Sequence, residues 1–147
     1  RGASMNRDAI CARLPHAGRM CLLDRLERWD SGSITCVATS HRDPDNPLRH
    51  DNRLHAVCGV EYAAQAMALH ASLLGAPDRP AAIGYLASVR DLQLDIEDLG
   101  GVRDELRIAA RRQYGDAGGL IYEFEIHAGD RRLLAGRIAA RLAGTDA

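Results

Sequence analysis

The feature that most constrains this chain is an almost uninterrupted apolar stretch at residues 56–75. Such a stretch predicts a helix that is buried on most of its surface. At helical spacing its apolar and small residues lie nearly all the way round the axis: Val57, Val60, Ala64, Met67, Ala68, Ala71 and Leu74. Gly75 followed by Pro77 predicts its end, because Gly accepts a left-handed closing conformation and Pro cannot continue the hydrogen-bond ladder.

Two polar residues lie one turn apart on one face of this predicted helix, Glu61 and Gln65. Burying an unpaired carboxylate costs free energy, so Glu61 must be protonated, be paired, or line a pocket. Each of these states is common at functional sites, and Glu61 is therefore the first candidate for a site residue.

Strand patterns stand on both sides of the helix. Alternating or apolar runs bounded by Gly-containing turns predict six strands, at residues 20–29, 33–40, 82–94, 105–113, 120–127 and 132–142. A run of strands on each side of one buried helix indicates an α+β fold, an antiparallel sheet of about six strands wrapped around that helix. Residues 6–13 predict a short helical turn, and the polar residues 41–54 predict an irregular excursion.

Length and charge limit the kind of protein. The 147 residues, 46% of them hydrophobic, suit one domain, which we expect at residues 5–147. Residues 1–4 precede Met5 and look like a remnant of cloning. A formal net charge of -1 with interleaved charges argues against a nucleic-acid partner. No apolar run approaches the roughly 18 residues that a membrane span needs.

The four cysteines predict a reducing compartment. Cys11, Cys21, Cys36 and Cys58 form no C-x-x-C pair, and their apolar neighbours suit buried free thiols better than a disulfide or a zinc site. We therefore expect a cytoplasmic protein.

Three motifs resemble a known family. They are L-P-H-A-G-R-M-C-L-L-D-R-L at residues 14–26, G-V-E-Y-A-A-Q-A-M-A at 59–68 and G-Y-L-A-S-V-R-D at 84–91. In this order, around one helix, they resemble the hot-dog-fold 3-hydroxyacyl-[acyl-carrier-protein] dehydratases of the FabZ and FabA kind. The ApeP-like branch of aryl polyene biosynthesis is the most similar, and the likeness extends over nearly the whole chain. The fold it implies is the hot-dog fold.

The resemblance implies loss of water from a 3-hydroxyacyl thioester, giving the trans-2-enoyl thioester without a metal or cofactor. A base removes the proton beside the thioester carbonyl, and histidine, with an ordinary pKa near ~6.5, is suited to this at neutral pH. An acid protonates the departing hydroxyl, and Glu61 matches the family's acidic residue. Backbone N–H groups near Cys58 and Gly59, at the helix start, are expected to stabilise the thioester oxygen. Gln65 is placed with them as a candidate substrate residue, although we expect it to hold Glu61 or a backbone carbonyl in preference to touching the substrate.

The base is less clearly marked, because Pro47 stands where FabZ and FabA carry an H-F-P motif. His16, between Pro15 and Gly18 in the first motif, is the favoured base, and His55 is second. We also considered His50. We expect His41, His50, His70 and His127 to be surface or loop residues, and Asp24 to be structural.

The implied partners are an acyl carrier protein with a phosphopantetheine-linked chain and a second copy of the chain, since hot-dog sites typically lie across a dimer interface. Arg49, Arg53 or Arg90 are candidates to meet the acidic carrier. Two rivals remain open. The first is an acyl thioesterase in which Glu61 attacks or activates water. The second is a non-catalytic acyl-binding partner in a synthase complex.

Overall fold

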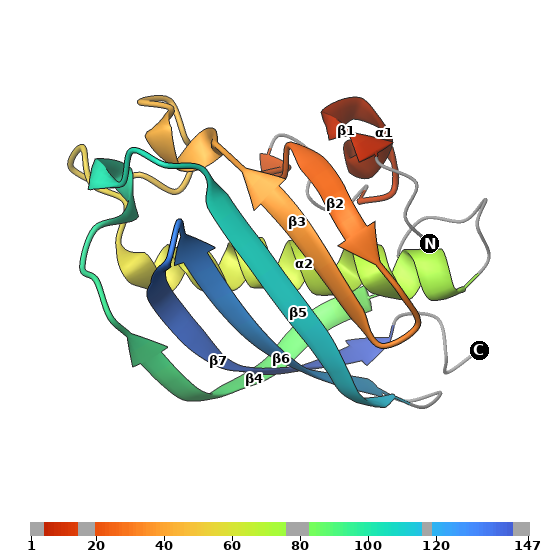
Figure 1. Cartoon of the computed structure of the whole chain (residues 1–147). Coiled ribbons are helices and arrows are strands. Elements are labelled where there is room, and N and C mark those ends of the chain that lie inside the picture. The colour runs from red at the N-terminus through yellow and green to blue at the C-terminus, as the bar shows by residue number, and fades with distance from the viewer. Residues whose placement is uncertain (1–4, 15–19, 76–82, 116–118, 143–147) are drawn as a thin grey trace.

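The computed structural model describes residues 5–14, 20–75, 83–115 and 119–142, with only the backbone at 83–87 and 142. An antiparallel sheet curves along one side of the long helix α2 (Figure 1). The strands are β1 (Met5–Asn6), β2 (Arg25–Trp29), β3 (Ser33–Ala38), β4 (Ile83–Leu94), β5 (Leu106–Gly115), β6 (Gly119–Ala128) and β7 (Arg131–Leu142). The helices are α1 (Arg7–Ala12) and α2 (Gly59–Leu74), with 3-10 turns η2 (Ser40–Arg42), η3 (Ala56–Cys58) and η4 (Leu99–Gly101).

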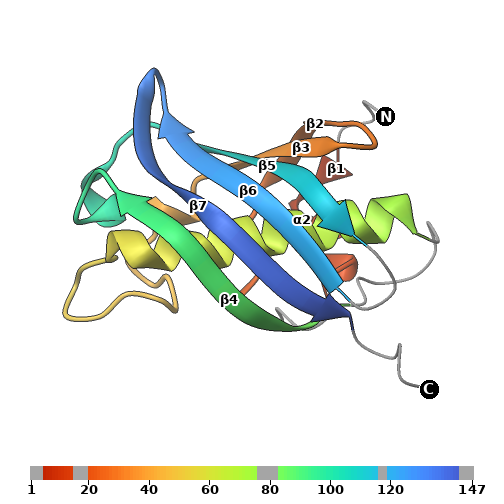
Figure 2. The same ribbon diagram turned by 90° about the horizontal axis from the view of Figure 1, so that it is seen from below.

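The sheet has seven strands in the order β1-β2-β3-β5-β6-β7-β4, and every neighbouring pair is antiparallel. Seen from below, β5, β6, β7 and β4 lie side by side across α2 (Figure 2). The predicted α+β fold, with an antiparallel sheet wrapped around one central helix, is confirmed. The seventh strand is β1, a two-residue strand that the sequence did not predict.

The core lies between α2 and the inner face of the sheet. Tyr62, Ala66 and Leu69 of α2 are fully buried, as are Ile108 of β5 and Ile126 of β6. Successive strand residues point to opposite faces, so the alternating buried residues of β5 and β6 all face the helix. Burial on most sides explains why this helix is rich in apolar and small residues.

The helix α2 ends at Gly75 as the sequence predicts, but Gly75 does not adopt the predicted left-handed conformation. Gly75 donates its N–H to Ala71 O at 3.1 Å. Its φ of -87° is not left-handed, which corrects the expected closing geometry. None of the described helices combines the length and apolarity that crossing a membrane would require.

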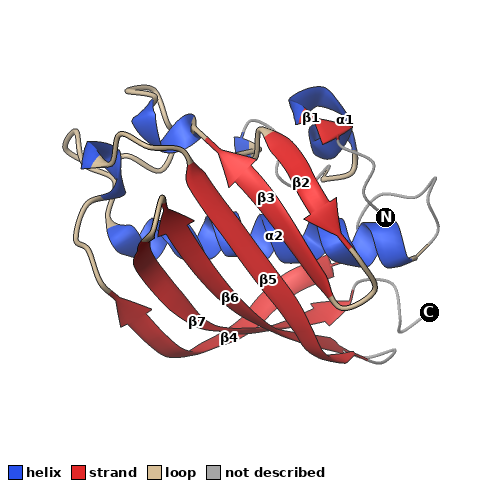
Figure 3. Ribbon diagram, in the orientation of Figure 1, coloured by secondary structure: helices blue, strands red, loops and turns tan. Residues whose placement is uncertain are grey.

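The short turns gather at one end of the molecule, beside the first turn of α2 (Figure 3). Ala56 N–H donates to Glu97 O at 2.8 Å, and Leu99 N–H donates to Leu54 O at 2.7 Å. These bonds join the segment that leads into α2 to the segment that follows β4. The irregular excursion predicted for residues 41–54 is present and begins at η2.

Candidate active site at the start of the central helix

Glu61 lies in the first turn of α2, where the partly positive end of the helix dipole favours a negative charge. Its side chain is half-buried. Gln65, one turn along the same face, donates from Nε2 to Glu61 Oε2 at 3.1 Å. Among the described residues no arginine forms an ion pair with Glu61. The carboxylate is therefore oriented by a neutral amide within the described chain.

Gln65 also holds the backbone of residues 20–24, which we call the clamped segment. Its Nε2 donates to Met20 O at 2.6 Å, and its Oε1 accepts from Leu22 N–H at 2.8 Å. Gln65 is only 4% exposed, so these bonds are largely shielded from water. The clamped segment is irregular, and the strand predicted at 20–29 begins only at Arg25. The prediction was wrong for 20–24, because the buried Gln65 side chain bonds to Met20 O and Leu22 N–H, and the backbone joins β3 only from Asp24 N–H, which donates to Val37 O at 2.9 Å.

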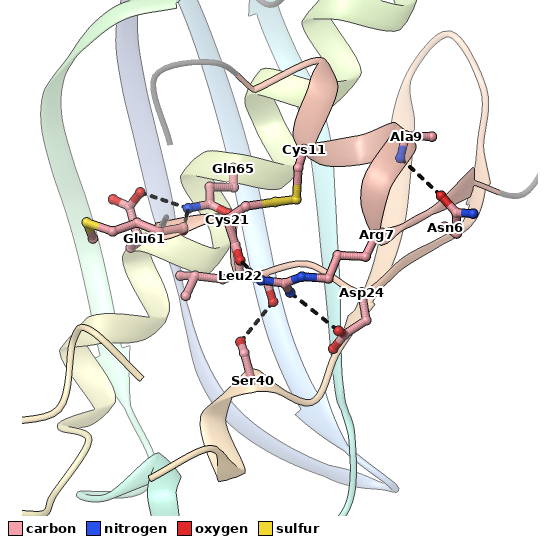
Figure 4. Close-up of a disulfide and its surroundings, with 11 residues drawn as sticks. Asn6, Arg7, Ala9, Cys11, Cys21, Leu22, Asp24, Ser40, Glu61 and Gln65 are labelled. Carbon is pink, nitrogen blue, oxygen red and sulfur yellow. Dashed lines mark hydrogen bonds and ion pairs between the residues drawn. A yellow bond between two sulfur atoms is a disulfide. The ribbon is translucent and has the colours of Figure 1, made fainter. Parts of the chain in front are cut away.

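A disulfide joins Cys11 of α1 to Cys21 of the clamped segment, with the two Cα atoms 5.8 Å apart (Figure 4). The expectation of four free thiols was wrong for this pair, because the fold packs α1 against a segment ten residues further on. Cys36 and Cys58 are free. Two free thiols, and not the four that were expected, remain as an indication of a reducing compartment.

Further bonds fix the clamped segment to its surroundings. Arg7 Nη2 donates to Cys21 O at 2.6 Å, and Arg7 Nη1 lies 3.5 Å from Asp24 Oδ1. Ser40 Oγ donates to Leu22 O at 2.8 Å. Asp24 accepts hydrogen bonds from both the backbone N–H and the hydroxyl of Thr39. Asp24 thus has the structural surroundings that the sequence suggested.

Among the described residues, no hydrogen bond or ion pair joins a histidine to Glu61. His16 lies outside the described residues. His55 is exposed and caps the start of η3, with a backbone bridge to Asp98. His50 is exposed, and its Nε2 lies 3.5 Å from Asp51 Oδ2. The identity of the base stays a prediction.

The amides proposed to stabilise the oxyanion already have partners. Cys58 N–H donates to His55 O at 2.9 Å, and Gly59 N–H donates within the same turn, to Ala56 O and Val57 O. An oxyanion role would require them to share these bonds. Close packing favours glycine at position 59, because a Cβ there would lie 2.7 Å from Leu134 Cδ1 on β7.

Two histidines expected at the surface are fully buried. His70 Nε2 lies 2.7 Å from Asp30 O, which can only accept, so Nε2 carries the proton and Nδ1 accepts from Tyr122 Oη at 2.5 Å. His41 Nε2 lies within 3.1 Å of Val102 O and within 3.0 Å of Asp104 O. Burial lowers the pKa of both histidines. Both histidines are buried because other parts of the fold pack over them, and residue type alone does not reveal this packing.

A groove of about 530 Å³ lies on the face of the sheet away from α2. Its charged lining comes from strand positions that alternate with the core-facing ones, including Arg111, Glu123 and Arg137. Arg111 Nη2 lies 2.5 Å from Glu123 Oε1, and Arg137 Nη2 lies 3.9 Å from Glu123 Oε2. These charges largely neutralise one another, and the sheet separates the groove from Glu61.

An antiparallel sheet wrapped around one long helix defines a hot-dog domain. The family model for ApeP-like proteins, described as ApeP dehydratase, matches residues 9–143. The chain therefore belongs to the ApeP-like dehydratase family, which confirms the resemblance found in its motifs.

Solved structures show the same fold. The dehydratase heterocomplex ApeI:P from Xenorhabdus doucetiae matches with a TM-score of 0.79 at 21% identity, over 92% of this chain and 91% of that one. A mutant thioesterase from Pseudomonas aeruginosa matches with a TM-score of 0.65 at 11% identity, over 95% and 94%. The PaaI protein of the E. coli phenylacetic acid degradation operon matches with a TM-score of 0.64 at 14% identity, over 95% and 91%.

No curated protein sequence matches the chain significantly. The family and the fold neighbours together support a dehydratase-like or thioesterase-like function.

Proposed function

We propose that this protein is a dehydratase that converts a 3-hydroxyacyl thioester on an acyl carrier protein into the trans-2-enoyl thioester. A histidine takes the proton from the carbon next to the thioester carbonyl, and Glu61 gives a proton to the hydroxyl, which leaves as water. His16 is the proposed base and His55 the alternative. The observation that carries the proposal is a half-buried Glu61 in the first turn of α2, in a chain of the ApeP-like dehydratase family.

The hydrogen bond at Glu61 leaves one carboxyl oxygen for the substrate. Gln65 Nε2 donates to Oε2, and Oε1 has no hydrogen-bond partner among the described residues. Oε1 is therefore the oxygen that can carry a proton and meet a substrate hydroxyl. The buried amide restricts rotation of the carboxyl group, so the proton is offered in one direction.

The proposal includes assembly partners. The Xenorhabdus structure is a heterocomplex, which supports a complex of hot-dog subunits for this chain as well, and we propose a homodimer as its basic unit. Among the arginines considered for the carrier protein, Arg49 is the least suited. Its guanidinium donates to Asp43 O at 2.9 Å, His41 O at 3.0 Å and Asn52 O at 3.2 Å. Arg53 is half-exposed, and Arg90 is exposed on β4.

The test is to incubate the protein with a 3-hydroxyacyl thioester on a carrier protein and on a short pantetheine, and to follow both the enoyl product and the free thiol. We expect the conjugated enoyl thioester with no release of thiol. An inert wild-type protein, over a range of chain lengths and aryl-bearing substrates, would refute the proposal.

A thioesterase is the second candidate, favoured by the thioesterase fold neighbours and by the carboxylate itself. In that reaction Glu61 would attack the acyl group or activate water, and no histidine would be needed. Thiol release without enoyl formation would identify this activity. Tight binding of the acyl thioester without turnover would instead identify an acyl-binding partner, the role that the lack of an H-F-P motif leaves open.

A further inference from the structure

The disulfide occupies a position that the proposed reaction does not explain. Cys21 stands between Met20 and Leu22, the two residues whose backbone groups bond to Gln65. A movement of Cys21 therefore shifts both bonds, and with them the amide that orients Glu61. Figure 4 shows the disulfide between Cys11 and Cys21, the neighbouring Leu22, and the hydrogen bond between Gln65 and Glu61.

The other end of the disulfide is itself anchored. Cys11 belongs to α1, whose first residue, Arg7, donates to Cys21 O. Arg13, which follows α1, donates from Nη1 to Ser72 Oγ on α2 at 2.7 Å. Thus α1 is attached to both the clamped segment and the central helix, and the disulfide is the one covalent link among these attachments in the described chain.

The two cysteine residues differ in burial. Cys21 is 4% exposed, whereas Cys11 is only partly buried where it packs against the core. Cys11 is therefore the side of the disulfide on which we place the attack of a thiolate reagent, since access is one of the factors that govern the rate of thiol–disulfide exchange.

We propose that the Cys11–Cys21 disulfide is a redox-sensitive restraint on the site. Reduction by a dithiol removes this restraint, loosens the hydrogen bonds between Gln65 and the clamped segment, and lowers turnover. A thiolate of the dithiol attacks Cys11 Sγ, and Cys21 leaves as a thiolate that takes up a proton. The second thiolate of the dithiol then displaces Cys11, so that two electrons and two protons pass to the protein and the reagent becomes a disulfide. The effect on turnover rests on the proposed function, whereas the loosening does not.

The two clamp bonds remain possible after reduction, and Leu22 and Leu23 still pack in the core, but the segment then has no covalent tie to α1. The Leu22 amide is a direct reporter, because its acceptor is Gln65 Oε1. We expect its hydrogen exchange to accelerate on the order of tenfold when the covalent tie is lost. Misalignment of Glu61 is expected to lower kcat about ten- to a hundredfold with little change in KM, because orientation matters most in the transition state.

The experiment compares wild-type protein before and after treatment with dithiothreitol, with the reduction verified by intact mass and the fold verified by circular dichroism. Cys11→Ser is expected to match reduced wild type in exchange and kcat, and to show no further response to the dithiol. Cys36→Ala removes a buried free thiol on β3 and is expected to keep the full response of the wild type.

Faster exchange at Leu22 together with a lower kcat supports the proposal. Unchanged exchange at Leu22 overturns it, and so does faster exchange with an unchanged kcat. If the protein turns over no hydroxyacyl substrate in either state, the proposed function fails, and the exchange of Leu22 alone then decides whether the disulfide fastens the segment.

Discussion

At the scale of single residues, Gln65 determines how Glu61 is presented. Leu22 N–H can only donate, so it requires the amide oxygen of Gln65, and the amide nitrogen must then face both Met20 O and Glu61. The orientation of this amide follows from its backbone partners. The position of Glu61 Oε2 is in turn tied to the backbone of the clamped segment.

Replacing Gln65 is expected to lower stability as well as activity. In Gln65→Ala the Leu22 N–H and the Met20 carbonyl lose their buried partner, which costs about 1–3 kcal/mol of unfolding free energy. Denaturant unfolding measures this difference. Gln113→Ala, at an exposed position of β5, is the matched control and should change stability by less than about 0.5 kcal/mol. Equal effects of the two substitutions would mean that the clamp does not stabilise the fold.

The buried histidines predict a loss of stability in mild acid. Burial lowers the pKa of His41 and His70, so below pH ~6.5 the unfolded chain binds more protons than the folded one. Their contribution to stability is complete above that pH and is lost as the pH falls towards their folded-state pKa values. Each contributes at most about 1.4 kcal/mol per pH unit. Unfolding free energies measured from pH 7 to 5 should therefore decrease.

Substitutions can show which residues cause this dependence of the unfolding free energy on pH. His70→Gln removes one titrating group, and its stability should depend less steeply on pH than that of the wild type, whatever its absolute value. Gln113→Ala, at an exposed position of β5, removes no titrating group, and its slope should equal that of the wild type. A wild-type slope retained in His70→Gln would contradict the assignment.

At the scale of elements, α2 approaches β7 closely at Gly59. In Gly59→Ala the added methyl group would meet Leu134 Cδ1 at 2.7 Å and Leu134 Cδ2 at 2.8 Å. Overpacking of this kind costs about 1–3 kcal/mol, offset by at most about 1 kcal/mol from the better helix propensity of Ala. Thermal or denaturant unfolding should show a net loss of stability.

Gly101→Ala is the control for this substitution, because a Cβ at Gly101 would meet nothing within 4 Å. Its stability should remain within about 0.5 kcal/mol of the wild type. If Gly59→Ala is as stable as this control, the helix and β7 are less tightly packed than the structure indicates.

Local sequence patterns predicted most of these elements. The apolar residues of α2 and the alternation in β5, β6 and β7 are short-range signals, and the predicted ranges agree with the observed strands to within one or two residues. The Glu61 and Gln65 pair was also visible, because residues four apart share a helix face.

The sequence could not reveal what depends on contacts between distant segments. The disulfide forms because α1 packs against the clamped segment, and a spacing of ten residues has no local signature. The same reason applies to the clamped segment, whose partner Gln65 is more than forty residues away, and to the burial of His41 and His70. Of the predicted site residues, Glu61 and Gln65 are hydrogen-bonded to each other, and Cys58, Gly59 and the backbone of His55 lie at the start of the same helix.

At the scale of the whole molecule, β4 is one edge of the sheet and pairs only with β7 among the described strands. Leu94, at the end of β4, is 47% exposed, and Val57 beside the start of α2 is 50% exposed. An unpaired strand edge with exposed apolar side chains favours association with another chain. This arrangement supports the proposed homodimer.

Leu94→Asp is expected to weaken such a dimer, because it places a charge in an apolar contact. Sedimentation analysis should show a shift towards monomer at micromolar protein concentration. Tyr114→Asp, at another exposed position near the end of β5, should leave the association unchanged. A dimer that resists Leu94→Asp would place the interface elsewhere on the molecule.

The central claim is that Glu61 supplies the acid for removal of water from a 3-hydroxyacyl thioester. The most direct measurement is the turnover of Glu61→Gln on that substrate beside wild type, since glutamine keeps the size of the side chain but has no acidic proton. The account predicts a loss of about 10²- to 10⁴-fold in kcat with an unchanged fold. A Glu61→Gln protein that forms the enoyl thioester at the wild-type rate would contradict it.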